Sequence, residues 1–186
     1  MDIRIEEINL ANQNHLNQVD FALTVDKVLD VVATGFGDTL HFLPVTAYEK
    51  RSPPDKYDVP GYIGSRDRVI FSAHADGDLA GQIILKRHWN HHAWIEEFVV
   101  DRVCRRRGVG RALMDRAREW ATTMGFPAIM LETQNNRAAA CCFYHDYGFK
   151  IGGYDRYLYY GTNSKPDEIA VFWYYFLREW KAIGET

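Results

Sequence analysis

Residues 105–110 read Arg105-Arg106-Arg107-Gly108-Val109-Gly110, and this stretch determines how its flanks are interpreted. Residues 94–100, just before it, contain Trp, Ile, Phe and two Val, which is typical of a β-strand. Residues 109–124, just after it, carry apolar side chains at helical spacing, and Gly125 and Pro127 end the periodic segment. The sequence therefore predicts a strand, a short basic turn with two glycines, and an amphipathic helix.

Such a turn is suited to an anionic ligand. Glycines at 108 and 110 let the backbone approach a ligand closely. The first N–H groups of a helix have no partners inside it, and the helix dipole makes their end attractive to anions. Arg105, Arg106, Arg107 and Arg111 add positive charge. We therefore expect a pyrophosphate group to bind here, although the glycines could also serve only to form a turn.

Two common nucleotide motifs are missing from the chain. It has neither Gly-x-x-x-x-Gly-Lys-Ser/Thr nor Gly-x-Gly-x-x-Gly, so a P-loop NTPase and a dinucleotide-binding fold are disfavoured.

The rest of the chain reads as a mixture of strands and helices. A hairpin is expected from residues 68–75 and 79–87 around Asp-Gly-Asp, and a second over 27–46. Further segments are expected as follows: strands at 3–8, 128–133, near 154–160 and 168–176, and a helix at 137–146. This order predicts an α/β (α+β) fold with a mostly antiparallel sheet and a central parallel strand pair. We expect a single domain over 1–186, with its core at about 67–176 and a mobile loop at 49–66.

A second landmark makes the first one more specific. Leu131-Glu132-Thr133 closes a strand, and the helix that follows carries Tyr144 and ends in Tyr147-Gly148-Phe149. Together with Arg-x-x-Gly-x-Gly at 105–110, this arrangement resembles the GNAT acetyltransferases over residues 94–149. The resemblance implies the acyl-CoA N-acyltransferase fold of that family and acetyl-CoA as co-substrate, with no metal.

The resemblance also implies which residues contact the cofactor. They are Phe98, Val99, Val100, Arg105, Arg106, Arg107, Gly108, Val109, Gly110, Arg111, Asn136, Arg137 and Tyr144. In the family, the strand at 98–100 pairs with the pantetheine arm. The family commonly has Asn seven residues before the helix Tyr, whereas this chain has Arg137 there, with Asn135 and Asn136 just before it.

Several stretches resemble one branch of the family, the streptothricin acetyltransferases. They are Trp89-Asn90, Ala93-Trp94-Ile95-Glu96-Glu97, Leu131-Glu132-Thr133-Gln134, Phe143-Tyr144-His145, Lys150-Ile151-Gly152-Gly153 and Ala170-Val171-Phe172-Trp173-Tyr174. The resemblance runs over about residues 67–176 and implies acetylation of an amine on the β-lysine moiety of streptothricin, which confers antibiotic resistance. A polyamine, an aminoglycoside or a protein amine is the alternative acceptor, and an acetyl-CoA-binding module without turnover is the alternative function.

Direct attack of an amine on a thioester needs a base and an acid. Glu132, Glu96 and Glu97 are the candidate bases. Glu96 and Glu97 are adjacent on a strand, so they reach one pocket only if a bulge intervenes, and one of them is otherwise solvent-facing. Tyr144 matches the family's general acid, and its alternative role is a core tyrosine.

The acceptor is expected to be cationic, which an acidic and aromatic pocket suits. The candidate substrate-binding residues are Trp89, Trp94, Glu96, Asp155 and Tyr159. His88, His91 and His92 form a cluster in a turn, which we interpret as solvated surface and not as a metal site.

Composition sets further limits. The formal net charge of the 186 residues is −3, which disfavours a protein that coats nucleic acid. There is no apolar window long enough for a membrane span, and the charged N-terminus lacks the apolar core of a signal peptide, so we expect a cytoplasmic protein. Three cysteines do not suggest a disulfide framework. Similar family members are often dimers, so a homodimer through the aromatic segment 172–176 is a further expectation.

Overall fold

The computed structural model describes residues 2–13, 16, 20, 22–51, 57–162 and 168–178. The chain divides into two compact units, and each is treated by itself. The first comprises Met1–Ala22, Arg51–Ile129 and Leu177–Thr186, and the second comprises Leu23–Lys50 and Met130–Phe176. The expectation of one domain over the whole chain stays a prediction.

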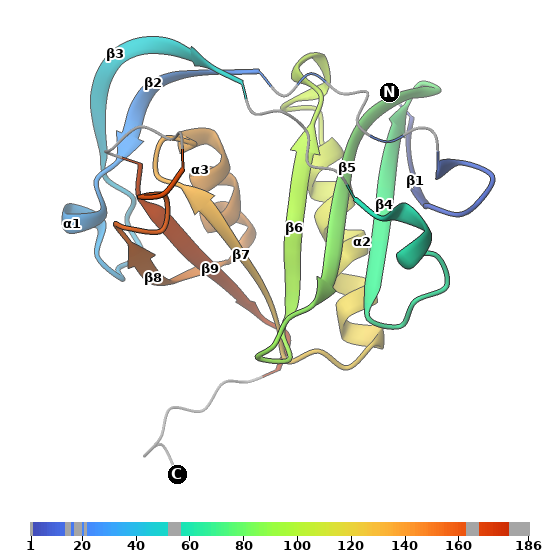
Figure 1. Ribbon diagram of the computed structural model, residues 1–186. Helices are drawn as coiled ribbons and strands as arrows, with labels where there is room; N and C mark the ends of the chain where they lie inside the picture. Colours follow the sequence, from blue (N-terminus) through green and yellow to red (C-terminus); the bar gives the residue numbers. More distant parts are fainter. Residues whose placement is uncertain are drawn as a thin grey trace. The chain divides into compact units, whose positions relative to one another are not determined.

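The first unit is built on four antiparallel strands. Their order is β1 (Ile3–Glu7), β4 (Arg68–Ala75), β5 (Asp78–Arg87) and β6 (Ala93–Val100) (Figure 1). The predicted hairpin between β4 and β5 is confirmed. It turns at Asp76 and Gly77, whose φ angles of 53° and 100° are those that a two-residue hairpin turn requires.

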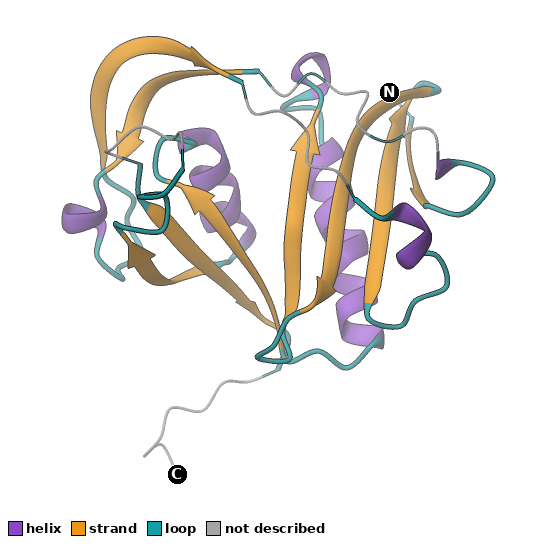
Figure 2. Ribbon diagram, viewed as in Figure 1, coloured by secondary structure: helices purple, strands orange, loops and turns teal. Residues whose placement is uncertain are grey.

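Helix α2 (Val109–Thr123) covers one face of these strands, against β4 and β5 (Figure 2). The face that it buries contains Val109, Leu113, Met114, Ala117, Trp120 and Ala121. On the other face, Ile70 and Ile84 pack with Ile8 and with Tyr62, which follows the 3-10 turn η2 (Val59–Gly61). The predicted amphipathic helix is therefore confirmed, and it ends within one residue of the expected position.

The second unit contains the remaining strands. Strand β7 (Ala128–Gln134, of which residues from Met130 belong here) is followed by α3 (Ala138–Tyr147), β8 (Lys150–Asp155) and β9 (Ala170–Phe176), in the sheet order β7-β9-β8. Strands β8 and β9 are antiparallel. Strands β2 (Leu23–Leu29) and β3 (Phe42–Lys50) form a separate antiparallel pair.

Two sequence predictions are corrected in this unit. The hairpin expected over 27–46 is a longer strand pair, and its two strands are connected through the short helix α1 (Val31–Thr34). This helix begins after Asp30 because the Asp30 carboxylate accepts the amides of Val32 and Ala33 at 3.0 and 3.1 Å. The strand expected near 154–160 ends at Asp155.

The reason for the second correction is a local hydrogen bond. The Asp155 carboxylate accepts the amide of Tyr157 at 2.7 Å, which turns the chain out of the sheet. Residues 156–162 form turns instead. The loop predicted at 49–66 begins later than expected, because Lys50 ends β3, and its residues 52–56 lie outside the described part of the chain.

No helix in the described ranges is both long and apolar enough to cross a bilayer.

Candidate active site

The predicted pyrophosphate cradle lies between β6 and α2 in the first unit. After Val100, the Asp101 carboxylate accepts the amide of Val103 at 3.0 Å and begins the 3-10 turn η3 (Arg102–Cys104). Arg106 and Gly108 then adopt positive φ angles of 63° and 90°. This backbone reversal directs the chain into the first turn of α2.

The start of α2 has the features of an anion site. The first helical hydrogen bond runs from the Ala112 amide to the Gly108 carbonyl at 3.0 Å, so the amides before Ala112 precede the helical ladder. The N-cap residue is Gly108, which has no side chain to cap this end of the helix. The side chains of Arg106, Arg107 and Arg111 are exposed around it. Backbone amides, helix dipole and guanidinium charge therefore meet at one end of one element.

Arg105 differs from the two arginines that follow it. Its Nε donates to the Val100 carbonyl at 3.1 Å, and its Nη2 donates to the Asp20 carbonyl at 3.3 Å. The Asp20 amide in turn donates to the Asp101 carboxylate at 2.9 Å. Arg105 thus braces the loop from inside, whereas Arg106 and Arg107 face solvent.

Strand β6 contains the bulge that would place Glu96 and Glu97 together. Ile84 of β5 pairs with Glu97, but the next residue, Leu85, pairs with Ile95. Glu96 is therefore the extra residue of a β-bulge. Glu97 lies on the Ile84 face of the sheet, opposite α2, and Glu96 is bonded to Tyr62, which packs on that same face.

The two carboxylates have different partners. Glu96 pairs with the Lys86 ammonium at 2.5 Å and accepts the Tyr62 hydroxyl. Burial, together with the bond to this carboxylate, raises the pKa of Tyr62. Glu97 accepts the side-chain amide of the fully buried Gln82.

The backbone at the end of β6 lies very close to β5. Phe98, Val99 and Val100 are half-buried and pair with Ile83, Gln82 and Gly81. A side chain at Gly81 would meet the Val99 carbonyl oxygen at 2.6 Å, so only glycine permits this approach.

The turn between β5 and β6 holds the histidine cluster, as predicted. The His88 amide donates to the His92 carbonyl at 2.9 Å, and His91 has a φ of 64°. Burial and the neighbouring histidines lower the pKa of His92. Trp94 stacks on His88 with ring centroids 5.0 Å apart, whereas Trp89 is 84% exposed. Within the described residues, no group of three or more His, Cys, Asp or Glu could hold a metal ion.

Glu132, on β7 of the second unit, differs from Glu96 in the partners of its carboxylate. It is half-buried, and its carboxylate accepts the Tyr159 hydroxyl. Burial raises the pKa of Glu132, and the Tyr159 bond and the charges of Arg137 and Lys50 oppose that shift. In the part of the chain that the structure describes, no cation forms an ion pair with it, so this carboxylate is placed to accept a proton.

A buried polar network lies at the ends of β3 and β7. Lys50 pairs with Glu168 at 2.6 Å and donates to Gln134 at 2.8 Å. The Asn136 amide donates to Glu168 at 3.0 Å and to the Tyr48 hydroxyl at 3.2 Å. Arg137 donates from Nε to the same Gln134 oxygen, at 3.2 Å.

This network was not predicted, because Lys50 and Glu168 are 118 residues apart and neither belongs to a motif. The pairing of these two residues could be predicted only if one already knew that their strands belong to the same unit. Tyr62, Lys86 and Gln82, the partners of Glu96 and Glu97, were missed for the same reason.

Tyr144 lies in the core of the second unit. It is 5% exposed, and its ring contacts those of Phe143, Phe149 and Trp173, with centroids 5.6 to 5.9 Å apart. Burial raises the pKa of its phenol. A phenol with a raised pKa keeps its proton at neutral pH and so has a proton to donate.

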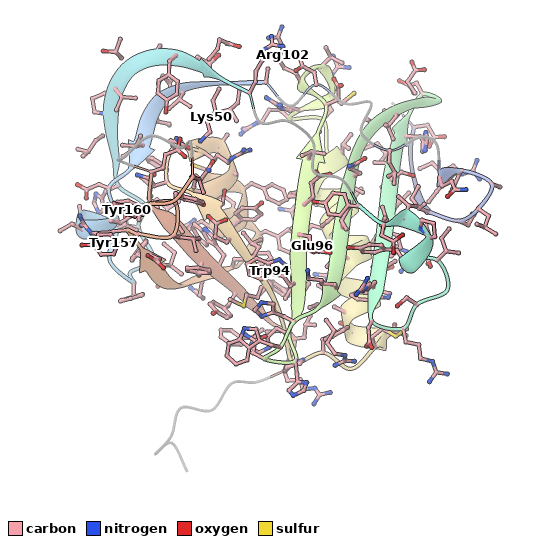
Figure 3. All side chains as sticks on the ribbon, viewed as in Figure 1. Lys50, Trp94, Glu96, Arg102, Tyr157 and Tyr160 are labelled. Atoms are coloured by element: carbon pink, nitrogen blue, oxygen red, sulfur yellow. The ribbon has the colours of Figure 1, made fainter. Side chains whose placement is uncertain are left out.

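The structure thus gathers the predicted residues in two groups. In the first unit, Trp94, Glu96 and Glu97 share β6 with the cradle that follows it; Figure 3 labels Trp94 and Glu96 on that strand and Arg102 just beyond it. In the second unit, Glu132 and Tyr159 are in contact. The Asp155 carboxylate is bonded within its own turn, and Trp89 projects into solvent.

Known proteins are similar to this chain in sequence and in fold. The acetyltransferase (GNAT) family matches residues 38–149. The chain is 38% identical to streptothricin acetyltransferase A of Bacillus subtilis, over 69% of this chain and 73% of that protein.

Two solved structures are similar over nearly their whole length. One is a Bacillus anthracis protein assigned as a streptothricin acetyltransferase and solved with acetyl coenzyme A, at 34% identity and a TM-score of 0.84, covering 96% of this chain and 100% of that one. The other is nourseothricin acetyltransferase, at 33% identity and a TM-score of 0.76, covering 94% and 98%. The α+β fold class is confirmed by these matches, and the chain belongs to the GNAT family of acetyltransferases.

Proposed function

We propose that the protein is an acetyl-CoA-dependent N-acetyltransferase that acetylates streptothricin on an amine of its β-lysine moiety. The observation that carries this proposal is the similarity to streptothricin acetyltransferases over more than two thirds of the chain. The relative solved with acetyl coenzyme A supports the choice of donor.

The donor's pyrophosphate is assigned to the cradle at 105–111. Amides at the start of α2 would bind its oxygens, and the exposed guanidinium groups of Arg106, Arg107 and Arg111 would balance its charge. The brace that Arg105 forms to Val100 and Asp20 holds this backbone in place before the ligand arrives. In this proposal, the backbone of Phe98, Val99 and Val100 pairs with the pantetheine arm.

Among the three candidate bases, Glu132 fits the task best. Glu96 is paired with the Lys86 ammonium, so a substrate ammonium would have to compete with that lysine for the carboxylate. Glu97 is bonded to Gln82. Burial raises the pKa of Glu132 and so brings its basicity closer to neutral pH, and its hydrogen-bond partner, the Tyr159 hydroxyl, is uncharged.

The proposed reaction is a direct transfer. Glu132 takes a proton from the acceptor ammonium, and the free amine attacks the thioester carbonyl to form a C–N bond. The C–S bond then breaks, and Tyr144 gives its proton to the departing thiolate. The nitrogen releases its second proton as the amide forms, and this proton restores the Tyr144 phenol. A backbone N–H of residues 98–100 would stabilise the oxyanion between the two steps.

An amine panel tests this proposal. Thiol release from acetyl-CoA is measured with streptothricin, spermidine, an aminoglycoside and a lysyl peptide, and tandem mass spectrometry locates the new acetyl group. We expect release with streptothricin and acetylation of its β-lysine chain. Release only with another amine would overturn the acceptor, and no release with any amine would overturn the enzyme.

A series of glutamine variants separates the bases. Glu132→Gln should lower kcat by about 100-fold or more, as loss of a general base does. Glu96→Gln and Glu97→Gln, which keep the same shape, should lower it less. A larger loss of kcat in Glu96→Gln or Glu97→Gln than in Glu132→Gln would indicate that the base is on β6.

A further inference from the structure

The loop after β8 places one of its tyrosines differently from the others. Tyr157 and Tyr160 are 77% and 91% exposed, and Figure 3 labels both on this loop. Tyr159, between them, is half-buried, and its hydroxyl donates to Glu132. Of these three tyrosines, Tyr159 alone has its hydroxyl on the carboxylate of the candidate base.

Local hydrogen bonds hold Tyr159 in this position. The Asp155 carboxylate accepts the Tyr157 amide at 2.7 Å, and the Tyr157 carbonyl accepts the Tyr160 amide at 2.9 Å. The Tyr159 carbonyl accepts both the amide and the hydroxyl of Thr162, at 3.0 and 2.9 Å. These bonds form consecutive turns that fix the backbone on both sides of Tyr159, whose hydroxyl contacts Glu132.

We propose that Tyr159 is a positioning residue for the general base: its hydroxyl orients the Glu132 carboxylate and keeps it ionised until the acceptor amine arrives. This inference rests on the proposed function, in which Glu132 is the base. It also replaces the sequence-based interpretation of Tyr159 as a substrate contact.

The physical basis is the difference between the two forms of Glu132. An ionised carboxylate is a much stronger hydrogen-bond acceptor than a carboxylic acid, so the phenol stabilises the ionised form. Burial favours the neutral form and raises the pKa of Glu132, and the Tyr159 bond is the largest effect in the opposite direction. Burial and the nearby carboxylate raise the pKa of Tyr159 itself, so this phenol stays a donor.

Other charges face Glu132 from the surrounding elements. Arg137 at the start of α3 and Lys50 at the end of β3 lower its pKa, and Glu168, just before β9, raises it. Cys141 and Tyr144 on α3 also interact with its charge, and burial keeps both of them protonated. None of these five is directly bonded to the Glu132 carboxylate in the described residues, so Tyr159 provides the only direct contact that orients it.

The test compares Tyr159→Phe with Tyr160→Phe on the same loop. Loss of the Tyr159 hydroxyl raises the pKa of Glu132, so a larger fraction of the base is protonated at any given pH. The acidic limb of the kcat/KM profile should move to higher pH, and kcat/KM at a pH on that limb should fall by about tenfold, as loss of a hydrogen bond to a charged group does. Tyr160→Phe, which removes an exposed hydroxyl, should reproduce the wild-type profile. A uniform loss with an unmoved limb would overturn the proposal.

A double-mutant comparison distinguishes positioning from packing. If Tyr159 acts through Glu132, Tyr159→Phe should cost nothing further in a Glu132→Gln background. An equal loss in both backgrounds would assign Tyr159 a structural role and overturn the proposal.

A measurement without turnover separates this inference from the proposed function. The carboxyl carbon of Glu132 is followed by 13C NMR in the isotope-labelled protein, with Glu132→Gln to assign the signal. The titration midpoint should be higher in Tyr159→Phe than in the wild type, whether or not any amine is acetylated. An unchanged midpoint would overturn the inference even if streptothricin proves to be the substrate.

Discussion

At the scale of single residues, two lysine–carboxylate pairs illustrate how burial determines the value of an ion pair. Lys50–Glu168 and Lys150–Asp38 have the same N–O distance of 2.6 Å. The side chains of the first pair are 14% and 5% exposed, and those of the second are 63% and 81% exposed. Removing one partner of a buried pair leaves an uncompensated charge in a poorly solvated place, whereas water replaces the lost partner at the surface.

The first prediction follows from this contrast. Lys50→Met should lower the free energy of unfolding by about 3 kcal/mol, because Glu168 Oε1 then retains, among the described residues, only the Asn136 amide. Lys150→Met, the matched control, should change it far less. Urea unfolding measures both, and equal losses would contradict the role assigned to burial.

Tyr144 gives a second prediction at this scale. Its raised pKa keeps the phenol protonated, so tyrosinate from Tyr144 should form only at a higher pH than from a solvent-exposed tyrosine while the protein is folded. The absorbance difference at 295 nm between wild type and Tyr144→Phe measures this directly. Tyr144→Phe should also lower kcat by about tenfold or more and leave the thermal midpoint nearly unchanged, since the ring contacts remain. Tyr147→Phe on the same helix is the control, and an equal loss of kcat in both would remove Tyr144 from the reaction.

At the scale of elements, the two features that define the site are deviations from regular structure. The β-bulge at Glu96 places two adjacent carboxylates toward one face of β6, and the left-handed Gly108 turns the chain into α2. A regular strand would have placed Glu96 and Glu97 on opposite faces, and a residue with negative φ at 108 would not have turned the chain into α2 in this way.

The third prediction concerns Gly108. Gly108→Ala should destabilise the protein by about 1 kcal/mol, because φ is 90° there, and a Cβ would meet only ordinary packing, with Ile3 3.6 Å away. Gly77→Ala in the β4–β5 turn has a similar φ of 100° and should cost about the same.

Binding distinguishes the two glycine variants. Relaxation of the strained backbone at 108 displaces the amides of the cradle, so acetyl-CoA affinity should fall by about tenfold, measured by calorimetry. Gly77→Ala should bind as the wild type does. Equal affinities in both variants would place the pyrophosphate outside the cradle.

At the scale of the whole molecule, a ligand that binds the folded protein stabilises it by mass action. Acetyl-CoA at 100 times its Kd should add about 2.7 kcal/mol to the free energy of unfolding. For a chain of this length, that raises the thermal midpoint by about 5–10 °C. S-acetylcysteamine, which has the thioester but no pyrophosphate, should produce almost no shift at the same concentration, and an equal shift would contradict the cradle assignment.

The sequence predicted local features well and distant ones poorly. The β4–β5 hairpin and α2 were predicted because Asp76-Gly77 and the helical spacing of Leu113, Ala117 and Ala121 are local signals. The strand expected at 154–160 was wrong, because one side-chain bond from Asp155 ends it. The Lys50–Glu168 pair could not be predicted, since it depends on which strands come together.

The sequence by itself determined the family and the pyrophosphate motif, because strand, glycine turn and helix follow one another along the chain and depend on local backbone preferences. Only the tertiary structure decided the environments of the acidic residues. It placed Lys86 and Tyr62 against Glu96, Gln82 against Glu97, and Tyr159 against Glu132. The basicity of a carboxylate depends on burial and on neighbours from distant parts of the chain, and those are set by folding and not by sequence order.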